Sequence, residues 1–259
     1  MLTNNQIQLF HTFGFLVLRQ LFLADEIATM KREADDIMAE ARQGKSFNPT
    51  QLEQVQPFFE RRPFLSQLVN DDRVYALGEG LVGPDFLLDG TEGNYYVGDT
   101  PWHGSVGQYT LLQEIKIVFY LDTLTRENGA LRVIPGSHLP VDPDHMTELR
   151  SRNKDPDFRP FGLHPHKIPS VAIDTEPGDV VIFTEDLIHG AFGGTKRRHL
   201  AVSFFKRPQT EEEHAFLRQQ YEQARFSLHP SESYVNSDHP RVRRMVGPLV
   251  ELGFEPGKI

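Results

Sequence analysis

The stretch PGDVVIFTEDLIHG, residues 177–190, predicts a short buried strand that starts at a turn and is followed by a histidine. Its Pro-Gly-Asp opening is a turn signal, and residues 180–183 form an apolar, β-rich run. Similar short runs recur from 86 to 205, with no long helical pattern between them. Turns are expected at Gly90, Gly93, 128–129, 135–136 and 177–178. Short strands with tight turns predict a fold that is mainly β with flanking helices, a double-stranded β-helix or jelly roll.

Helical patterns lie on both sides of this strand-rich region. Residues 3–12 predict a short helix and residues 15–18 a strand, whereas residues 63–83 predict further helical pieces. Residues 25–41 carry one apolar stripe at helical spacing, which is typical of a helix packed on a core. The stripe consists of Ile27, Met30, Ala34, Ile37 and Met38. A charged helix is expected again over 210–226.

The length of 259 residues, 39% of them hydrophobic, is sufficient for one sizeable core. We expect a single domain, because all-β barrels of this size commonly form one unit. It would consist of a helical N-terminal part (1–84), a jelly-roll core (85–207) and a helical C-terminal tail (208–259). Residues 140–170 interrupt the core with prolines and charges and little periodicity. This segment is a candidate substrate lid, and a solvated connection is the alternative.

Composition excludes several function classes. The 36 acidic and 27 basic side chains give a net charge of −9, which argues against nucleic acid or an anionic membrane as the main partner. The absence of cysteine excludes disulfides and thiolate metal sites. We find no apolar stretch long enough to span a membrane and no charged-then-apolar leader. The sequence predicts a soluble, cytoplasmic protein with a small-molecule partner, and it specifies no oligomeric state.

Two histidines stand in contexts typical of metal ligands. His189 follows the apolar strand of 177–190, and His103 lies in TPWHGS, residues 100–105. Non-heme oxygenases hold ferrous iron with two imidazoles and one carboxylate, which leaves positions for a 2-oxo acid and dioxygen. The first histidine and the carboxylate usually stand at i and i+2 on a strand end, where both side chains face the same way. Here the second of these positions is Ser105, whose neutral hydroxyl is a poor iron ligand.

Several ordered blocks of the chain resemble the phytanoyl-CoA dioxygenase family of iron and 2-oxoglutarate dependent oxygenases. Besides the two histidine contexts, these blocks are FHTFGFLVL (10–18), IKIVFYLD (115–122) and ENGALRVIPGSH (127–138). The likeness covers roughly residues 5–207, and its ordered blocks are more specific than any lone motif. It implies a jelly roll that uses Fe(II), 2-oxoglutarate and dioxygen on a small organic substrate. The departure from the family falls on Ser105, where the carboxylate ligand is expected.

The resemblance implies that His103 and His189 bind the iron and that Ser105 marks the replaced ligand. Arg198 follows His189 by nine positions, on a strand-like segment. An arginine there would grip the distal carboxylate of 2-oxoglutarate as a bidentate fork. Arg197 is the fallback for this role.

Strand alternation adds further candidates for the cosubstrate pocket. Glu114, Lys116 and Tyr120 share one face of their strand, and a polar face lining the barrel would suit a charged cosubstrate. We therefore name Lys116 as a cofactor-binding residue. Asn94 and Tyr96, on the strand before His103, are second-rank candidates for the same pocket.

Three hypotheses account for Ser105. The open ligand position would bind chloride or another halide, as in the related iron halogenases that carry Gly or Ala there. Alternatively, water or a more distant carboxylate, Asp99 or Glu114, completes the metal shell and the enzyme performs ordinary hydroxylation or a related oxidation. In the third hypothesis the chain is a degenerate family member that binds a small molecule without turnover. An engineered replacement of a natural ligand would also produce this sequence.

Three other motifs in the sequence match their consensus patterns less well. HGSVG, residues 103–107, lacks the first glycine of a nucleophile elbow and no amphipathic helix follows it, so a serine hydrolase is less favoured. The glycines of 78–83 match a dinucleotide fingerprint inside a helical stretch instead of after a strand. His164 and His166 have chelating spacing, but proline-flanked pairs in polar loops are usually solvated surface.

Overall fold

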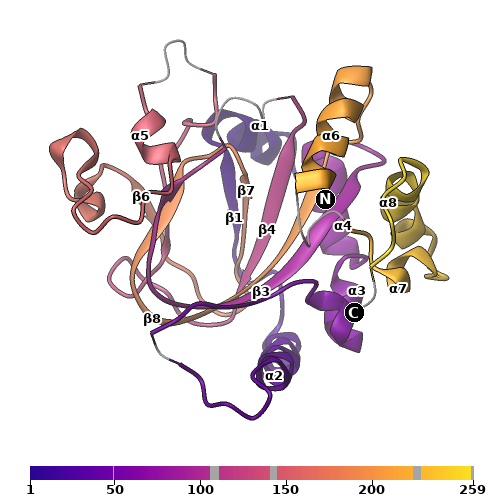
Figure 1. The fold of residues 1–259 in the computed structure, drawn as a ribbon, viewed down its shortest axis with the longest axis horizontal. Coiled ribbons are helices and arrows are strands. Elements are labelled where there is room, and N and C mark those ends of the chain that lie inside the picture. Colours follow the sequence, from indigo (N-terminus) through magenta and orange to yellow (C-terminus); the bar gives the residue numbers. More distant parts are fainter. Residues whose placement is uncertain (49, 106–110, 141–144, 224–228, 258–259) are drawn as a thin grey trace.

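Strands that curl around an interior form the body of the protein, and helices gather beside and below them in the computed structural model of Figure 1. The structure describes residues 1–48, 50–105, 111–140, 145–223 and 229–257. The strands are β1 (Phe15–Leu18), β2 (Glu53–Val55), β3 (Leu87–His103), β4 (Glu114–Tyr120), β5 (Leu131–Val133), β6 (Val171–Ile173), β7 (Val180–Thr184) and β8 (His189–Phe205). The α-helices are α1 (Asn4–Phe13), α2 (Ala24–Ala41), α3 (Pro63–Leu68), α4 (Asp72–Val82), α5 (Thr147–Arg150), α6 (Glu211–Gln223), α7 (Glu232–Val235) and α8 (Pro240–Glu251).

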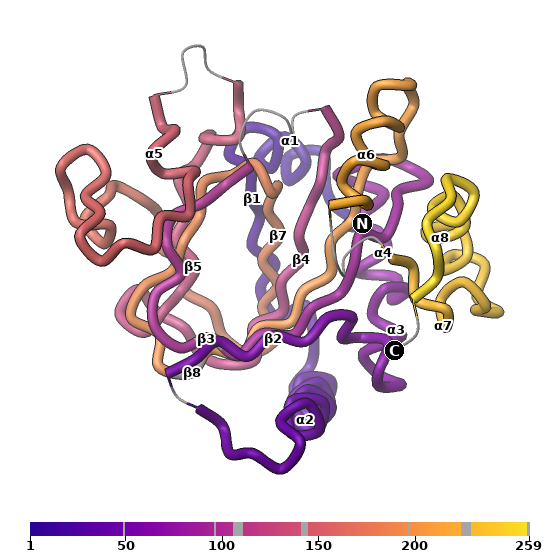
Figure 2. The backbone as a smooth tube through the Cα atoms, viewed as in Figure 1, coloured from indigo at the N-terminus to yellow at the C-terminus, as the bar shows by residue number. Residues whose placement is uncertain are grey.

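Two long antiparallel strands, β3 and β8, build the barrel. They pair from Leu87 opposite Phe205 to His103 opposite His189, with register shifts between Tyr96 and His103. One part of the pair lies in a sheet of order β1-β7-β4-β8-β3-β2, and β5 and β6 extend the other part into a second sheet. Irregularities of this kind bend strands, so β3 and β8 pass from one sheet to the other (Figure 2). The expected jelly roll is confirmed.

The two faces of the strands pack into two separate hydrophobic cores. On β4, Ile115, Ile117 and Phe119 pack with the apolar stripe of α2 and with α3 and α4. Val118 and Tyr120 face the barrel interior, together with residues of β5 and β7. The predicted stripe of α2 is buried throughout. Alternation along each strand therefore separates a helix-covered core from the barrel interior, in which the candidate site lies.

Two of the predicted turns are wrong. Gly90 and Gly93 lie inside β3, which continues without a break from Leu87 to His103. A Cβ at Gly93 would come within 2.3 Å of the Phe58 ring, so this glycine permits close packing instead of a turn. The turns at 128–129, 135–136 and 177–178 are present, and each of their glycines has a positive φ. Among the described residues, no helix has the length and apolar character needed to cross a membrane.

Candidate metal centre

His103 and His189 face each other at the end of the β3–β8 pair. Their ring centroids are 4.0 Å apart. The Nδ1 atom of His103 lies 2.8 Å from the carbonyl oxygen of Pro101, and that of His189 lies 2.7 Å from the carbonyl oxygen of Leu187. Because a carbonyl oxygen can only accept, both Nδ1 atoms carry the proton, and the lone pair of each Nε2 is available to a metal.

Both imidazoles are held in the neutral form that a metal requires. Burial lowers the pKa of His189 to about 4, against a smaller opposing effect of the Leu187 carbonyl. Burial and then the neighbouring His189 lower the pKa of His103 well below its usual value. Neutral ligands need not lose a proton when the metal binds, so the pair suits a divalent cation at neutral pH.

Among the residues that the structure describes, no third protein ligand of the usual kind joins the two histidines. Within the described ranges, no three or more His, Asp or Glu side chains converge as a metal-binding group. The Asp99 carboxylate is engaged elsewhere, with Oδ1 accepting from the backbone N of Gly193 at 2.8 Å and Oδ2 lying 3.0 Å from Nε2 of His166. The backbone of Ser105 is held from both sides, because its N donates to Glu185 O at 3.2 Å and its O accepts from Arg150 at 3.1 Å. Among the described residues, the donor set is therefore the two imidazoles, and Ser105 lines the adjoining cavity.

Arg197, and not Arg198, lies in the cavity with the histidines. Arg197 is buried, and its guanidinium donates to Gly129 O at 2.7 Å and to Thr100 Oγ1 at 3.0 Å. Arg198 lies on the opposite face of β8, where it pairs with Asp122 at 2.5 Å and with Asp35 of α2 at 3.0 Å. Expecting Arg198 in the pocket was therefore an error of one strand position, because alternate residues of a strand face opposite ways.

The other sequence candidates are distributed over the same interior. The Lys116 ammonium lies 2.7 Å from Glu185 and 3.4 Å from Glu92. Burial opposes its charge, yet Glu185 and Glu92 raise the pKa of Lys116 well above its usual value. Asn94 is fully buried beside Glu92. Tyr96 stands opposite Arg197 in the β3–β8 register, and its side chain lies outside the described part of the structure.

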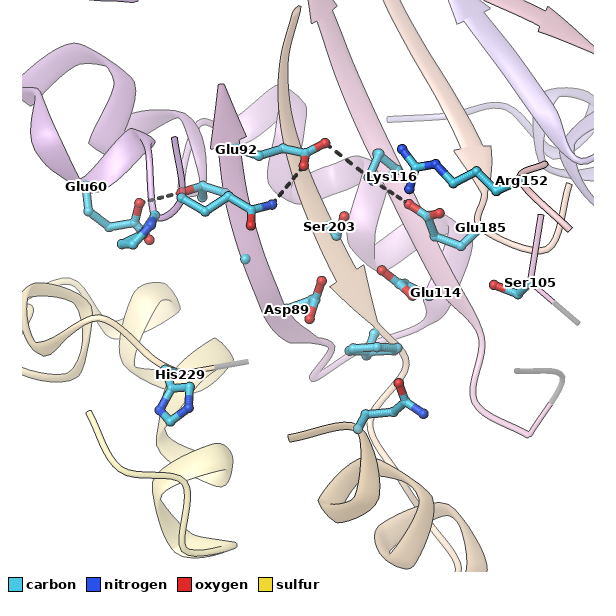
Figure 3. Close-up of a pocket in the computed structure, with 16 residues that line it drawn as sticks. Glu60, Asp89, Glu92, Ser105, Glu114, Lys116, Arg152, Glu185, Ser203 and His229 are labelled. Carbon is cyan, nitrogen blue, oxygen red and sulfur yellow. Dashed lines mark hydrogen bonds and ion pairs between the residues drawn. The ribbon is translucent and has the colours of Figure 1, made fainter. Parts of the chain in front are cut away.

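Two adjoining cavities occupy the barrel. The first, the histidine cavity, has a volume of about 160 Å³ and is lined by His103, His189 and Arg197 among others. The second, the acidic cavity, has a volume of about 450 Å³. Its charged lining is Glu60, Asp89, Glu92, Glu114, Lys116, Arg152 and Glu185, and Ser105 lies at its edge (Figure 3). Both cavities are lined by Glu92, Lys116, Arg152 and Glu185, so they adjoin at these four side chains.

Sequence reasoning missed most of the acidic cavity. Glu92 stands two residues before Asn94 on β3, and strand alternation was the signal that could have found it. Asp89, Glu185 and Glu60 carry no such signal, because β3, the end of β7 and the segment before α3 meet only in the folded chain.

The described part of the lid segment crosses the histidine end of the barrel. Ser151 forms an antiparallel bridge with His103. Farther along, the indole of Trp102 donates to Pro165 O at 2.9 Å, and Arg132 donates to His166 O at 3.0 Å. A cleft of about 570 Å³ lies between this segment and β3. These contacts hold the described part of 140–170 over the histidine end of the barrel, and residues 141–144 lie outside the described part. That this segment is a substrate lid stays a prediction.

The structural neighbours of this chain are iron and 2-oxoglutarate dependent oxygenases with the same jelly-roll fold. The chain belongs to the phytanoyl-CoA dioxygenase family, because the family model described as Phytanoyl-CoA dioxygenase (PhyH) matches residues 10–200. Among similar curated proteins, the ectoine dioxygenase of Sphingopyxis alaskensis is 24% identical over 217 residues, which cover 74% of this chain and 71% of the relative.

Two solved structures show the same fold. HygX from Streptomyces hygroscopicus, with nickel and 2-oxoglutarate bound, superposes with a TM-score of 0.63 at 19% identity and covers 82% of this chain and 90% of its own. EctD from S. alaskensis with bound Fe has a TM-score of 0.61 at 21% identity and covers 82% and 80%. The family and these relatives define the class of the chain as oxidoreductase.

Proposed function

We propose that this chain is an iron and 2-oxoglutarate dependent oxygenase that oxidises a C–H bond of a small organic substrate. The observation that carries the proposal is the pairing of His103 and His189, each with its Nδ1 proton on a backbone carbonyl and its Nε2 free. Bound ferrous iron would supply dioxygen activation, with 2-oxoglutarate leaving as succinate and carbon dioxide. The two histidines would hold the metal at the junction of β3 and β8.

Arg197 is the residue that would anchor 2-oxoglutarate. Its guanidinium is buried in the histidine cavity, and its contacts with Gly129 and Thr100 fix the plane of the group. A preoriented guanidinium binds a carboxylate as a two-pronged fork and loses little entropy on doing so. Lys116 is a weaker candidate, because Glu92 and Glu185 already neutralise it.

The electrostatics at Ser105 favour hydroxylation or a related oxidation over halogenation. Ser105 lines a cavity with five carboxyl groups and two cationic side chains. A halide beside Ser105 would lie next to this excess of negative charge, which disfavours a second anion. Water at the open position carries no such cost. We therefore expect an exchangeable water, and not chloride, as the ligand that replaces the carboxylate.

The test combines metal binding with turnover. Anaerobic titration should give about one ferrous site per chain, and His103→Ala or His189→Ala should abolish it, since two imidazoles are the minimal shell. The control is His164→Ala, an exposed lid histidine outside the pair. Succinate release from 2-oxoglutarate should not depend on chloride. Unchanged iron affinity in both variants would remove the oxygenase proposal, and cosubstrate binding without succinate release under any substrate tried would favour the degenerate binder.

A further inference from the structure

The charges of the acidic cavity define a substrate class. We propose that the substrate carries an ammonium or guanidinium group, which binds between Asp89 and Glu114 at the end of the cavity away from the histidines. That this ligand is the substrate rests on the proposed function. Its binding to the carboxyl pair requires no metal and can be tested separately.

Three of the five carboxyl groups in the cavity already have partners. Lys116 contacts Glu185 at 2.7 Å and Glu92 at 3.4 Å. The side-chain amides of Gln54 and Gln56 also donate to Glu92, at 3.2 Å and 2.9 Å. In addition, the Thr91 hydroxyl donates to Glu60. Each of these three groups therefore already has a donor within the protein.

Asp89 and Glu114 differ from them. Both residues are only partly exposed, and their side chains point into the cavity (Figure 3). Within the described ranges the two carboxyl groups hydrogen-bond to each other, and no N–H group or hydroxyl of another residue donates to either. Buried carboxyl groups normally receive hydrogen bonds, so this pair lacks donors that a ligand would bring.

The raised pKa values of Asp89 and Glu114 are consistent with a site that binds a cation. Burial, only partly offset by Lys116, raises the pKa of Asp89 to about 7. Burial and the adjacent Asp89 raise the pKa of Glu114 well above its usual value. Like charges in a shared buried site repel each other, and a cation between them would stabilise both ionised forms.

An organic cation fits this site better than a metal ion. A divalent metal needs several oxygen ligands converging at roughly 2.0–2.6 Å. The described residues include no such converging group of three or more His, Asp or Glu. An ammonium has three donors and a guanidinium five, and both reach carboxylates at longer distances. The volume of about 450 Å³ lies in the range of small-molecule sites.

The positions of the charges also orient the ligand. Asp89 and Glu114 line the acidic cavity alone, whereas Lys116 and Arg152 line both cavities. In the lining shared by both cavities, these two cations are matched by the carboxylates of Glu92 and Glu185. The carboxyl groups of Asp89 and Glu114 have no such match, so a cationic group is attracted to that pair. The rest of the substrate would extend past Lys116 toward His103 and His189, where its C–H bond would be oxidised.

Calorimetric titration of the metal-free full chain tests this proposal with four probes of similar size: butylamine, butylguanidine, butanol and butyrate. The two cations should bind, and butanol and butyrate should bind at least about ten-fold more weakly. This comparison uses the wild-type protein, so it does not depend on the folding of a variant. Equal affinity for butanol and butylamine would overturn the proposal.

The double variant Asp89→Asn with Glu114→Gln should lose cation binding by about ten-fold or more while keeping the shape of the cavity. A matched control is Asp36→Asn with Glu212→Gln, which removes the same charge from exposed positions on α2 and α6. Unchanged cation binding in the cavity variant would contradict the site. The cation titration uses the metal-free chain, so its result does not depend on whether the enzyme forms succinate. Conversely, a failure to bind cations would not affect the conclusion of the oxygenase test.

Discussion

A single strand position decides which arginine lies in the histidine cavity. Arg197 lies in the histidine cavity, while Arg198 is held by Asp122 and Asp35 on the outer face of β8. Arg197→Lys keeps the charge but loses the planar fork, so the affinity for 2-oxoglutarate should fall by about 1.5–3 kcal/mol. Arg198→Lys is the matched control and should bind 2-oxoglutarate normally. Anaerobic 2-oxoglutarate titration checks both, and the opposite ranking would refute the assignment.

Ser105 is the second residue at which a substitution tests the proposed metal site. Restoring a carboxylate with Ser105→Asp should tighten ferrous iron by about ten-fold or more, because an anionic oxygen replaces a neutral or exchangeable ligand beside a dication. The neutral isostere Ser105→Asn separates charge from size and should leave the affinity near that of the wild type. Metal titration is the measurement. If Asp and Asn bind iron equally, position 105 does not face the metal.

Among the elements, the lid segment depends on one residue at the end of α5. Arg150 donates to three backbone carbonyls, those of Ser105 at 3.1 Å, Asp186 at 2.9 Å and Ser137 at 2.5 Å. These carbonyls belong to three separate segments around the site, so Arg150 joins the lid to the barrel.

Arg150→Met should therefore destabilise the fold by about 2–4 kcal/mol, since buried carbonyls lose charged donors. It should also speed amide exchange in 145–155. The control is Arg159→Met in the same segment, because Arg159 donates to the carbonyls of Pro156 and Phe158 nearby in sequence. Exchange rates near residue 150 that match those of the control would show that the lid is held by other contacts.

The elements also show where sequence patterns succeed. Local periodicity identified α2 and its buried stripe, and Pro177-Gly178 marked the start of β7. The strands β3 and β8 are much longer than the expected short strands, at 17 residues each. Glycines inside them resembled turns because close approach and bending require the same residue type that turns require. Whether Gly93 packs or turns is decided by Phe58, a residue distant in sequence.

At the scale of the whole molecule, motif order predicted the jelly roll and the two histidines, because each histidine sits in its own recognisable segment. The acidic cavity was not predictable in this way. Its carboxyl groups come from separate segments, and their effect depends on their mutual distances and on burial. Which face of β8 an arginine occupies likewise follows from the strand register. Because Arg197 and Arg198 are adjacent, the sequence does not show which of the two faces the barrel interior.

The buried carboxyl groups should also make global stability depend on pH. Burial raises the pKa of Glu60 to about 7 from the ordinary 4.5, although the hydrogen bond from Thr91 opposes the shift. The folded protein thus retains a proton that the unfolded chain releases between these values. The stability from this group is complete below about pH 4.5 and is lost as the pH rises through about 7.

Glu60→Gln keeps a hydrogen-bond acceptor for Thr91 and removes the ionisation. Its free energy of unfolding should equal that of the wild type near pH 5 and exceed it by about 1–3 kcal/mol at pH 8.5. Urea denaturation at both pH values measures the difference, with the exposed Glu212→Gln as control. Because Asp89 has a similarly raised pKa, part of the pH dependence should persist in the variant. Parallel pH profiles for Glu60→Gln and wild type would mean that Glu60 is already ionised in the folded protein at pH 5.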